Sequence, residues 1–77
     1  MNITKGKILK LTDTSFSGGK PVTSISLVRI TFVNEFRAEW ELVEELQFDG
    51  VRTSQSGSFA LRFVPMMVAE GQLEEVA

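Results

Sequence analysis

The sequence lacks cysteine, histidine and tyrosine altogether. Without cysteine and histidine, the chain can form no disulfide and offers no thiolate or imidazole ligand to a metal ion. The commonest general base, the best nucleophile and a phenolic acid are also missing, so catalysis would have to depend on serine with lysine or on paired carboxylates. We therefore predict that the protein is not an enzyme and that it holds no metal and no cofactor.

Long apolar runs are absent as well. The longest, residues 59–69, is interrupted by Arg62 and Pro65, and it is much shorter than the roughly 20 residues that a membrane span requires. The first residues contain no apolar core of the kind found in a secretory signal. These absences predict a soluble, cytoplasmic protein that does not enter a membrane.

The chain is short, and its 77 residues leave room for one domain. We predict a single domain over residues 1–77, in which the acidic, polar residues 71–77 form a frayed tail. Small domains without disulfides or metals often gain stability from another subunit. A protein partner or self-association is therefore expected.

The net charge of −2 conceals an uneven distribution along the chain. Residues 1–33 contain five basic residues and one acidic residue, whereas residues 34–77 contain three basic and nine acidic residues. Such an asymmetry indicates either a basic binding face with an acidic face elsewhere, or solvated lysines on an edge strand beside an acidic helix. The second interpretation needs no partner, and it is the commoner case.

Two segments have the pattern of β-strands. Residues 3–12 alternate in part and are rich in lysine, and residues 22–33 are rich in β-branched residues with apolar side chains on both faces. In the second segment, strict alternation places Phe32 on the face of Ile30. Residues 13–21 between them contain serine, two glycines and Pro21, which predicts a loop joining the two strands of a hairpin.

Residues 34–47 fit two structures. At helical spacing, Phe36, Trp40 and Val43 fall on one stripe, and Asn34 is a suitable N-cap. However, apolar and charged residues also alternate over residues 36–42, which is typical of a strand if a bulge lies near Val43. The glutamate-rich composition favours the helix.

The C-terminal part predicts short elements. Asp49-Gly50 and residues 54–58 are turn or loop signals around a possible short strand at residues 51–53. Residues 59–64 read as a strand that Pro65 ends, followed by an edge strand or a short helix. The predicted fold is therefore α+β, a β-hairpin followed by a helix and C-terminal strands in a ββαβ-like order. The alternative is an all-β, five-stranded small barrel.

For function, the composition favours a non-enzymatic protein-interaction or assembly module, for example an inhibitor or adaptor that docks an acidic face on a basic partner. Aromatic and methionine side chains are common at binding surfaces, and the glutamates of the ambiguous segment supply the acidic face. The candidate binding residues are Phe16, Glu39, Glu41, Glu44, Glu45, Met66 and Met67.

The alternative function is a small OB-like β-barrel that binds single-stranded nucleic acid, in which lysines follow the phosphates and an aromatic ring stacks on the bases. Residues 18–27 resemble the first hairpin of single-stranded DNA-binding proteins with the OB fold, and residues 59–65 are similar to the closing strand of the small filamentous-phage versions. The likeness covers only these two segments. The candidate residues are Lys5, Lys7, Lys10, Phe16, Lys20 and Arg29.

Overall fold

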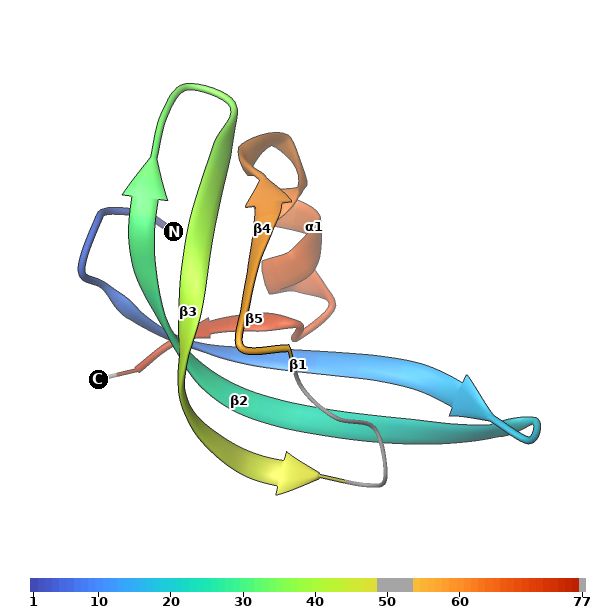
Figure 1. Cartoon of the computed structure of the whole chain (residues 1–77). Helices are drawn as coiled ribbons and strands as arrows, with labels where there is room; N and C mark the ends of the chain where they lie inside the picture. The colour runs from blue at the N-terminus through green and yellow to red at the C-terminus, as the bar shows by residue number, and fades with distance from the viewer. Residues whose placement is uncertain (49–53, 77) are drawn as a thin grey trace.

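The computed structural model describes residues 1–48 and 54–76 and shows a half-barrel of antiparallel strands (Figure 1). In the sheet order β4-β3-β2-β1-β5, a meander of four strands is completed by a fifth strand that returns beside the first. A 3-10 helix and a short α-helix connect the last two strands. The elements are β1 (Ile8–Ser17), β2 (Lys20–Val33), β3 (Arg37–Phe48), β4 (Ser56–Ala60), η1 (Leu61–Phe63), α1 (Val64–Ala69) and β5 (Leu73–Glu75).

The predicted α+β, ββαβ-like fold is wrong, and the all-β alternative is closer to the structure. Residues 37–48, where a helix was favoured, form β3. Asn34 does not cap a helix: its side-chain Oδ1 accepts hydrogen bonds from the backbone N–H groups of Phe36 and Arg37, at 2.8 and 2.9 Å. This Asx turn reverses the chain between β2 and β3. Pairing on both sides of β3 outweighs the helix propensity of its glutamates.

Bulges explain why the sequence of β3 lacks the regular alternation of a strand. Leu42 pairs with Val28 and Glu44 pairs with Leu27, which leaves Val43 between them without a partner across the ladder. A second shift follows nearby, between residues 45 and 47. An extra residue in one strand breaks the alternation of side chains without ending the pairing. The sequence pattern that indicated a helix is therefore a strand with two irregularities.

A third shift lies in β2 and reverses the predicted direction of two side chains. Ile30 pairs with Trp40, Phe32 pairs with Glu39, and Thr31 between them is the inserted residue. After this bulge Val33 packs against the core, whereas Phe32 is 42% exposed. Strict alternation predicted the same face for Ile30 and Phe32, and the bulge makes that prediction wrong.

The core lies on the concave face of the sheet. Its buried side chains come from β1, β2, β3, α1 and β5, and they are Leu9, Val28, Ile30, Ala38, Trp40, Val64 and Leu73. Phe59 of β4 and Met67 of α1 pack against this cluster. The helix and β5 therefore cover the open side of the curled sheet, so that both faces of the core are lined by apolar side chains.

The last strand involves residues for which a frayed tail was predicted. Leu73 pairs with Leu11 on the edge of β1 and is fully buried. One residue earlier, the carbonyl oxygen of Gln72 accepts a hydrogen bond from the N–H of Thr12, at 2.9 Å. The structure thus places residues 73–75 in the sheet, next to the first strand of the chain.

The β1–β2 hairpin extends well beyond the body of the molecule (Figure 1). The loop predicted over residues 13–21 is strand on both sides of a two-residue turn, Gly18-Gly19, flanked by the pair Ser17 and Lys20. Both glycines have positive φ angles, 59° and 79°, as a tight hairpin turn of this kind requires. The predicted hairpin is confirmed, but its first strand covers Ile8–Ser17 instead of residues 3–12, and its second strand begins two residues earlier than predicted, at Lys20.

The C-terminal segments differ from the prediction by a few residues. The strand expected at residues 59–64 begins at Ser56 and ends at Ala60, so part of the expected loop is strand. Pro65 lies in the first turn of α1, where its missing N–H costs nothing. The turn predicted at Asp49-Gly50 and the strand predicted at residues 51–53 lie outside the described residues.

Candidate functional site on the concave face

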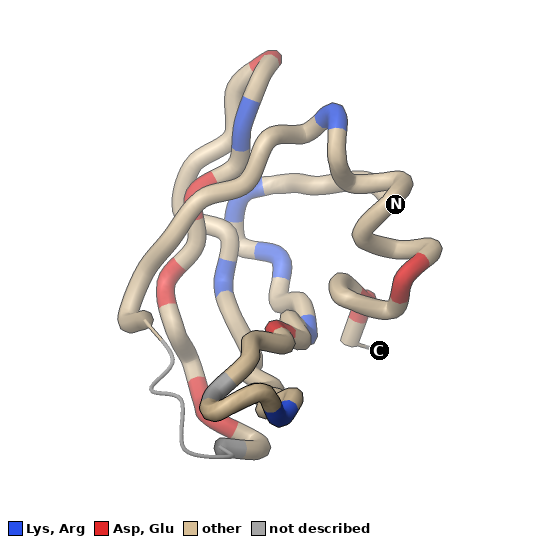
Figure 2. The backbone as a smooth tube through the Cα atoms, turned by 90° about the vertical axis from the view of Figure 1, so that its right-hand side faces the viewer, with Lys and Arg blue, Asp and Glu red and all other residues tan. Residues whose placement is uncertain are grey.

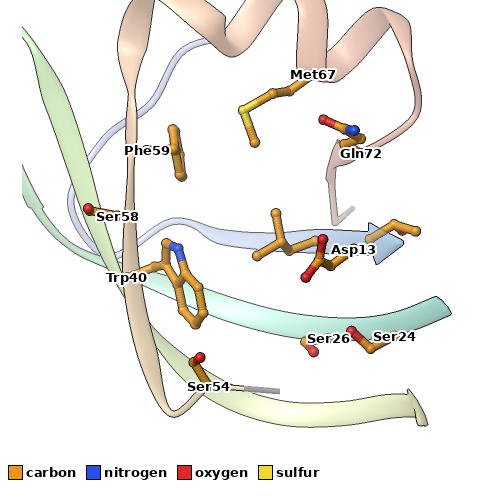
Figure 3. Close-up of a pocket in the computed structure, with 11 residues that line it drawn as sticks. Asp13, Ser24, Ser26, Trp40, Ser54, Ser58, Phe59, Met67 and Gln72 are labelled. Atoms are coloured by element: carbon orange, nitrogen blue, oxygen red, sulfur yellow. The ribbon is translucent and has the colours of Figure 1, made fainter. Parts of the chain in front are cut away.

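A hollow of about 240 Å³ opens on the concave face where the hairpin leaves the body of the molecule. Trp40 of β3, Phe59 of β4 and Met67 of α1 line one side of it, and Asp13 of β1 lies across from them (Figure 3). The hollow thus combines an aromatic and thioether wall with a carboxylate. Its residues come from β1, β2, β3, β4 and α1, which the curl of the sheet brings together.

Small side chains on β2 are the reason that the hollow exists. The inner face of this strand carries Val28 and Ile30 in the body, and Ser26 and Ser24 further toward the hairpin. Both serines are buried and line the hollow. Among the described residues, no buried side-chain nitrogen or oxygen lacks a hydrogen-bond partner. The serines therefore form a small polar floor that leaves volume unfilled above it.

Two carboxylates lie on either side of this serine floor. Asp13 pairs with Ser24 from β1, and Glu45 pairs with Ser26 from β3. Residues directly opposite each other in a sheet share a face, so both carboxylates belong to the concave side. Both are exposed, and neither forms an ion pair with a described residue. The concave face therefore carries negative charge without a bound counterpart.

The predicted acidic face is not one surface in the structure. Glu39 and Glu41 flank the inward-facing Trp40 and so point to the convex side. They form ion pairs with Arg37, at 3.5 Å, and with Arg29, at 3.0 Å. Glu44 is exposed on β3 and forms no ion pair with a described residue. Of the predicted glutamates, Glu45 alone is placed by its pairing on the concave face.

The other predicted contact residues are dispersed. Phe16 is 75% exposed near the tip of the hairpin, far along the arm from the body. On α1, Met67 lines the hollow, whereas Met66 is half exposed outside it. The structure therefore brings one predicted methionine and one predicted glutamate to the concave face and leaves Phe16 elsewhere.

The predicted basic surface is largely paired with carboxylates. Lys7 forms an ion pair with Glu75, Lys10 with Glu74 at 3.6 Å, and Arg29 with Glu41, as described above. The hydrogen bond and the charge of Lys7 lower the pKa of the Glu75 carboxyl below its ordinary value of 4.5. Figure 2 shows basic and acidic positions on neighbouring segments of the chain, not on separate halves.

Two of the predicted cations remain available. Lys5 and Lys20 are exposed and form no ion pair with a described residue. Lys20 lies at the tip of the hairpin close to Phe16, whereas Lys5 lies in the N-terminal turn before β1. The structure therefore separates them and gives no continuous basic stripe.

Sequence reasoning missed the residues that define the hollow. Asp13 was assigned to a loop, Gln72 to a frayed tail, and the serines of β2 were recognised only as strand residues. Two serines at alternate positions of a strand that is otherwise apolar on that face are the signal that could have found the site. They indicate a face that stops filling the core partway along the strand.

A second exposed surface lies at the opposite end of the molecule, around the β2–β3 turn. The guanidinium of Arg37 lies over the ring of Phe32, at 5.8 Å from its centroid, and that of Arg62 over Phe63, at 4.9 Å. Phe36 in the turn is 75% exposed. Such contacts between cations and aromatic rings stabilise exposed side chains modestly.

Other kinds of site are not found in the described part of the chain. Within residues 1–48 and 54–76, no three acidic side chains gather as a metal site would require. No helix among these residues combines the length and the apolar character that a membrane span requires. Comparison of the chain with protein-family models, curated proteins and solved structures finds no match.

Proposed function

We propose that the protein is a non-enzymatic, cytoplasmic interaction module whose concave face binds a lysine or arginine side chain from a basic segment of a protein partner. The observation that carries the proposal is the placement of Asp13, which has no ion-pair partner among the described residues, opposite the wall formed by Trp40, Phe59 and Met67.

The chemistry of the hollow fits a long basic side chain. Lysine and arginine have an apolar stem that packs on aromatic and thioether groups, and a charged end that binds a carboxylate. The aromatic faces of Trp40 and Phe59 add attraction for a cation. Glu45, on the same face, increases the negative potential that attracts the partner.

The size of the hollow also favours a side chain over a free small molecule. Its volume of about 240 Å³ is below the roughly 300–1,000 Å³ of sites that enclose a drug-sized ligand or cofactor. A hollow of this size, open to solvent and placed on a concave surface, accommodates one side chain while the rest of the partner lies on the surrounding surface.

A fluorescence titration tests the proposal, because Trp40 is the only tryptophan of the chain and lies in the hollow. We expect a lysine-rich peptide to change the Trp40 emission and a glutamate-rich peptide of equal length to leave it unchanged. Asp13→Asn should weaken binding by about tenfold, because it removes the charge but keeps the shape. Glu70→Gln, an exposed acidic residue after α1, is the matched control and should bind as the wild type does.

Equal responses to both peptides, or an Asp13→Asn variant that binds as tightly as Glu70→Gln, would contradict the proposal. A tight, salt-sensitive complex with a single-stranded oligonucleotide, lost in Phe16→Ala, would favour the nucleic-acid function instead. That alternative is supported by the neighbouring exposed Phe16 and Lys20. It is weakened by the ion pairs that Lys7, Lys10 and Arg29 form with carboxylates of the same chain.

A further inference from the structure

The backbone of β1 has a free edge beside the hollow. If the hollow binds a basic side chain, as proposed above, this edge is placed to bind the backbone of the same partner segment. We infer that the basic segment of the partner binds as an added β-strand along residues 12–16 of β1, continuing the ladder that β5 begins, with one basic side chain in the hollow.

The pairing of β1 leaves one of its edges open. β1 pairs with β2 along its whole length, from Ile8 to Ser17, but with β5 only from Leu9 to Leu11. The ladder with β2 has no register shift. No described residue pairs with the part of this edge beyond Thr12, where the N–H group is taken by Gln72.

The register shows which backbone groups face that edge. Ser17 and Lys20 flank the two-residue turn and so form a hydrogen-bonded pair, which makes the odd-numbered residues of β1 the ones that bond to β2. The N–H and C=O groups of the even-numbered residues point away from β2. The bond from the Thr12 N–H to Gln72 on that side agrees with this assignment. Thr14 and Phe16 therefore present their backbone donors and acceptors to the open edge.

The open edge and the hollow belong to one surface. Asp13 lies between Thr12 and Thr14, and Asp13 and Thr12 both line the hollow. Side chains of a strand alternate between its two faces, so a strand added here directs every second side chain to the concave side. Backbone hydrogen bonds would fix the register, and the hollow would select the side chain, as in other cases of strand addition.

The charges on this edge identify the occupant. Natural edge strands are commonly protected by lysine, proline, a bulge or an inward-pointing charge, and of these residues 12–17 of β1 have only the inward-pointing charge. Their one charged residue is Asp13. Antiparallel pairing of this edge with the same edge of a second copy would bring two Asp13 carboxylates close together, which is unfavourable. An extended segment with a lysine or arginine is favoured for the same reason.

A pair of variants at Thr14 tests the role of the backbone. Thr14→Pro removes an N–H that faces the open edge and is not used in the ladder with β2, and proline is tolerated in such edge positions. Thr14→Val keeps the N–H and the β-branched shape. With a short peptide of alternating valine and threonine around one lysine, we expect Thr14→Pro to weaken binding by about tenfold and Thr14→Val to leave it unchanged. Thermal melting of both variants shows that the sheet is intact.

The peptide provides a second test that does not depend on the folding of variants. N-methylation at alternate residues removes backbone donors from one edge of the peptide strand. Methylation of one alternate set should abolish binding, and methylation of the other should have little effect. Equal binding of both methylated peptides would overturn strand addition, and so would equal binding by the two Thr14 variants.

These outcomes separate the two proposals. If Asp13→Asn weakens binding while the Thr14 variants and both methylated peptides bind alike, the hollow binds a basic side chain without an added strand. If the unmodified peptide does not bind to the wild type, the proposed function itself fails. A dimer of the wild type in sedimentation that Thr14→Pro dissociates would show that the edge pairs with a second copy, and would also overturn the inference.

Discussion

The indole of Trp40 lies directly on Gly57, its cross-strand neighbour in β4. A Cβ atom built on Gly57 would approach the indole ring to 2.5 Å, so the glycine is required by the close approach of the ring and not by its backbone angles. The absence of a side chain at Gly57 allows the indole of Trp40 to pack closely against β4, buried and beside the hollow.

We predict that Gly57→Ala destabilises the protein by about 1–2 kcal/mol. Forcing a methyl group into packed space costs roughly 1–3 kcal/mol. Alanine also lowers the conformational entropy of the unfolded chain, which stabilises the folded state by only about 0.4–1 kcal/mol. Urea unfolding followed by Trp40 fluorescence measures the difference, with Ser56→Ala in the same strand as the control. An alanine variant as stable as the wild type would show that the ring moves without cost.

Truncation of Leu73 should be costly, because this fully buried side chain comes from the short last strand. Leu73→Ala is expected to lower the free energy of unfolding by roughly 2–5 kcal/mol. Val76→Ala, three residues later and exposed, should change it by less than about 0.5 kcal/mol. Similar stabilities of the two variants in urea unfolding would mean that residues 73–75 do not belong to the folded domain.

Because of the bulge at Thr31, we predict that Val33 contributes more to stability than Phe32, which is the opposite of what simple alternation predicts. Val33→Ala should destabilise the protein by about 1–2 kcal/mol, because Val33 packs on the core. Phe32→Ala should cost about 0.5–1 kcal/mol, since it removes an exposed ring and its contact with Arg37. Thermal or urea unfolding of the two variants decides the order, and a larger effect at Phe32 would place the bulge elsewhere.

The ion pair of Lys7 with Glu75 gives a pH dependence of known sign. Because the pKa of Glu75 is lowered in the folded state, the contribution of the pair is present above the ordinary value of 4.5 and is lost as the pH falls through the lowered pKa. Glu75→Gln should therefore melt at a lower temperature than the wild type at about pH 7, and this difference should decrease as the pH falls through the lowered pKa of Glu75.

Lys7→Met is the matched control for that experiment. It removes the other partner, so it should reduce the difference between high and low pH in the same way. Because the Lys7 side chain is 26% exposed and that of Glu75 is 52% exposed, solvent screens the pair, so the effect at neutral pH should be small and should decrease with added salt. A difference between Glu75→Gln and the wild type that grows on acidification would contradict this account.

Local signals in the sequence were sufficient to predict the β1–β2 hairpin but not to identify β3 as a strand. Two glycines between β-branched segments identify a tight turn on their own, because the backbone angles of that turn exclude most other residues. The assignment of β3 depended on Val43 being a bulge, and a bulge is defined by the partner strand, which local sequence does not specify. The same reason explains the reversed directions of Phe32 and Val33.

The candidate site could not be predicted from the sequence, for a related reason. Asp13 lies near one end of the chain and Met67 near the other, and the return of β5 to the edge of β1 brings them together. The sequence showed that carboxylates, aromatics and methionines were available, but it grouped them by position along the chain. Their cross-strand partners, such as Arg29 for Glu41, decide which of these charges are neutralised and which stay available.

The position of β5 also has a consequence for protein synthesis. Of the described strands, β1 is made before the others and finds one neighbour in β2 at once, whereas its other neighbour, β5, is made after the other four. Until residues 73–75 emerge, the core lacks Leu73 and the backbone of Leu9–Leu11 has an uncovered edge. Contacts between distant parts of a chain also form slowly. A nascent chain of this protein therefore completes its sheet only after translation has passed its final strand, and before that point β1 is exposed to any other strand nearby.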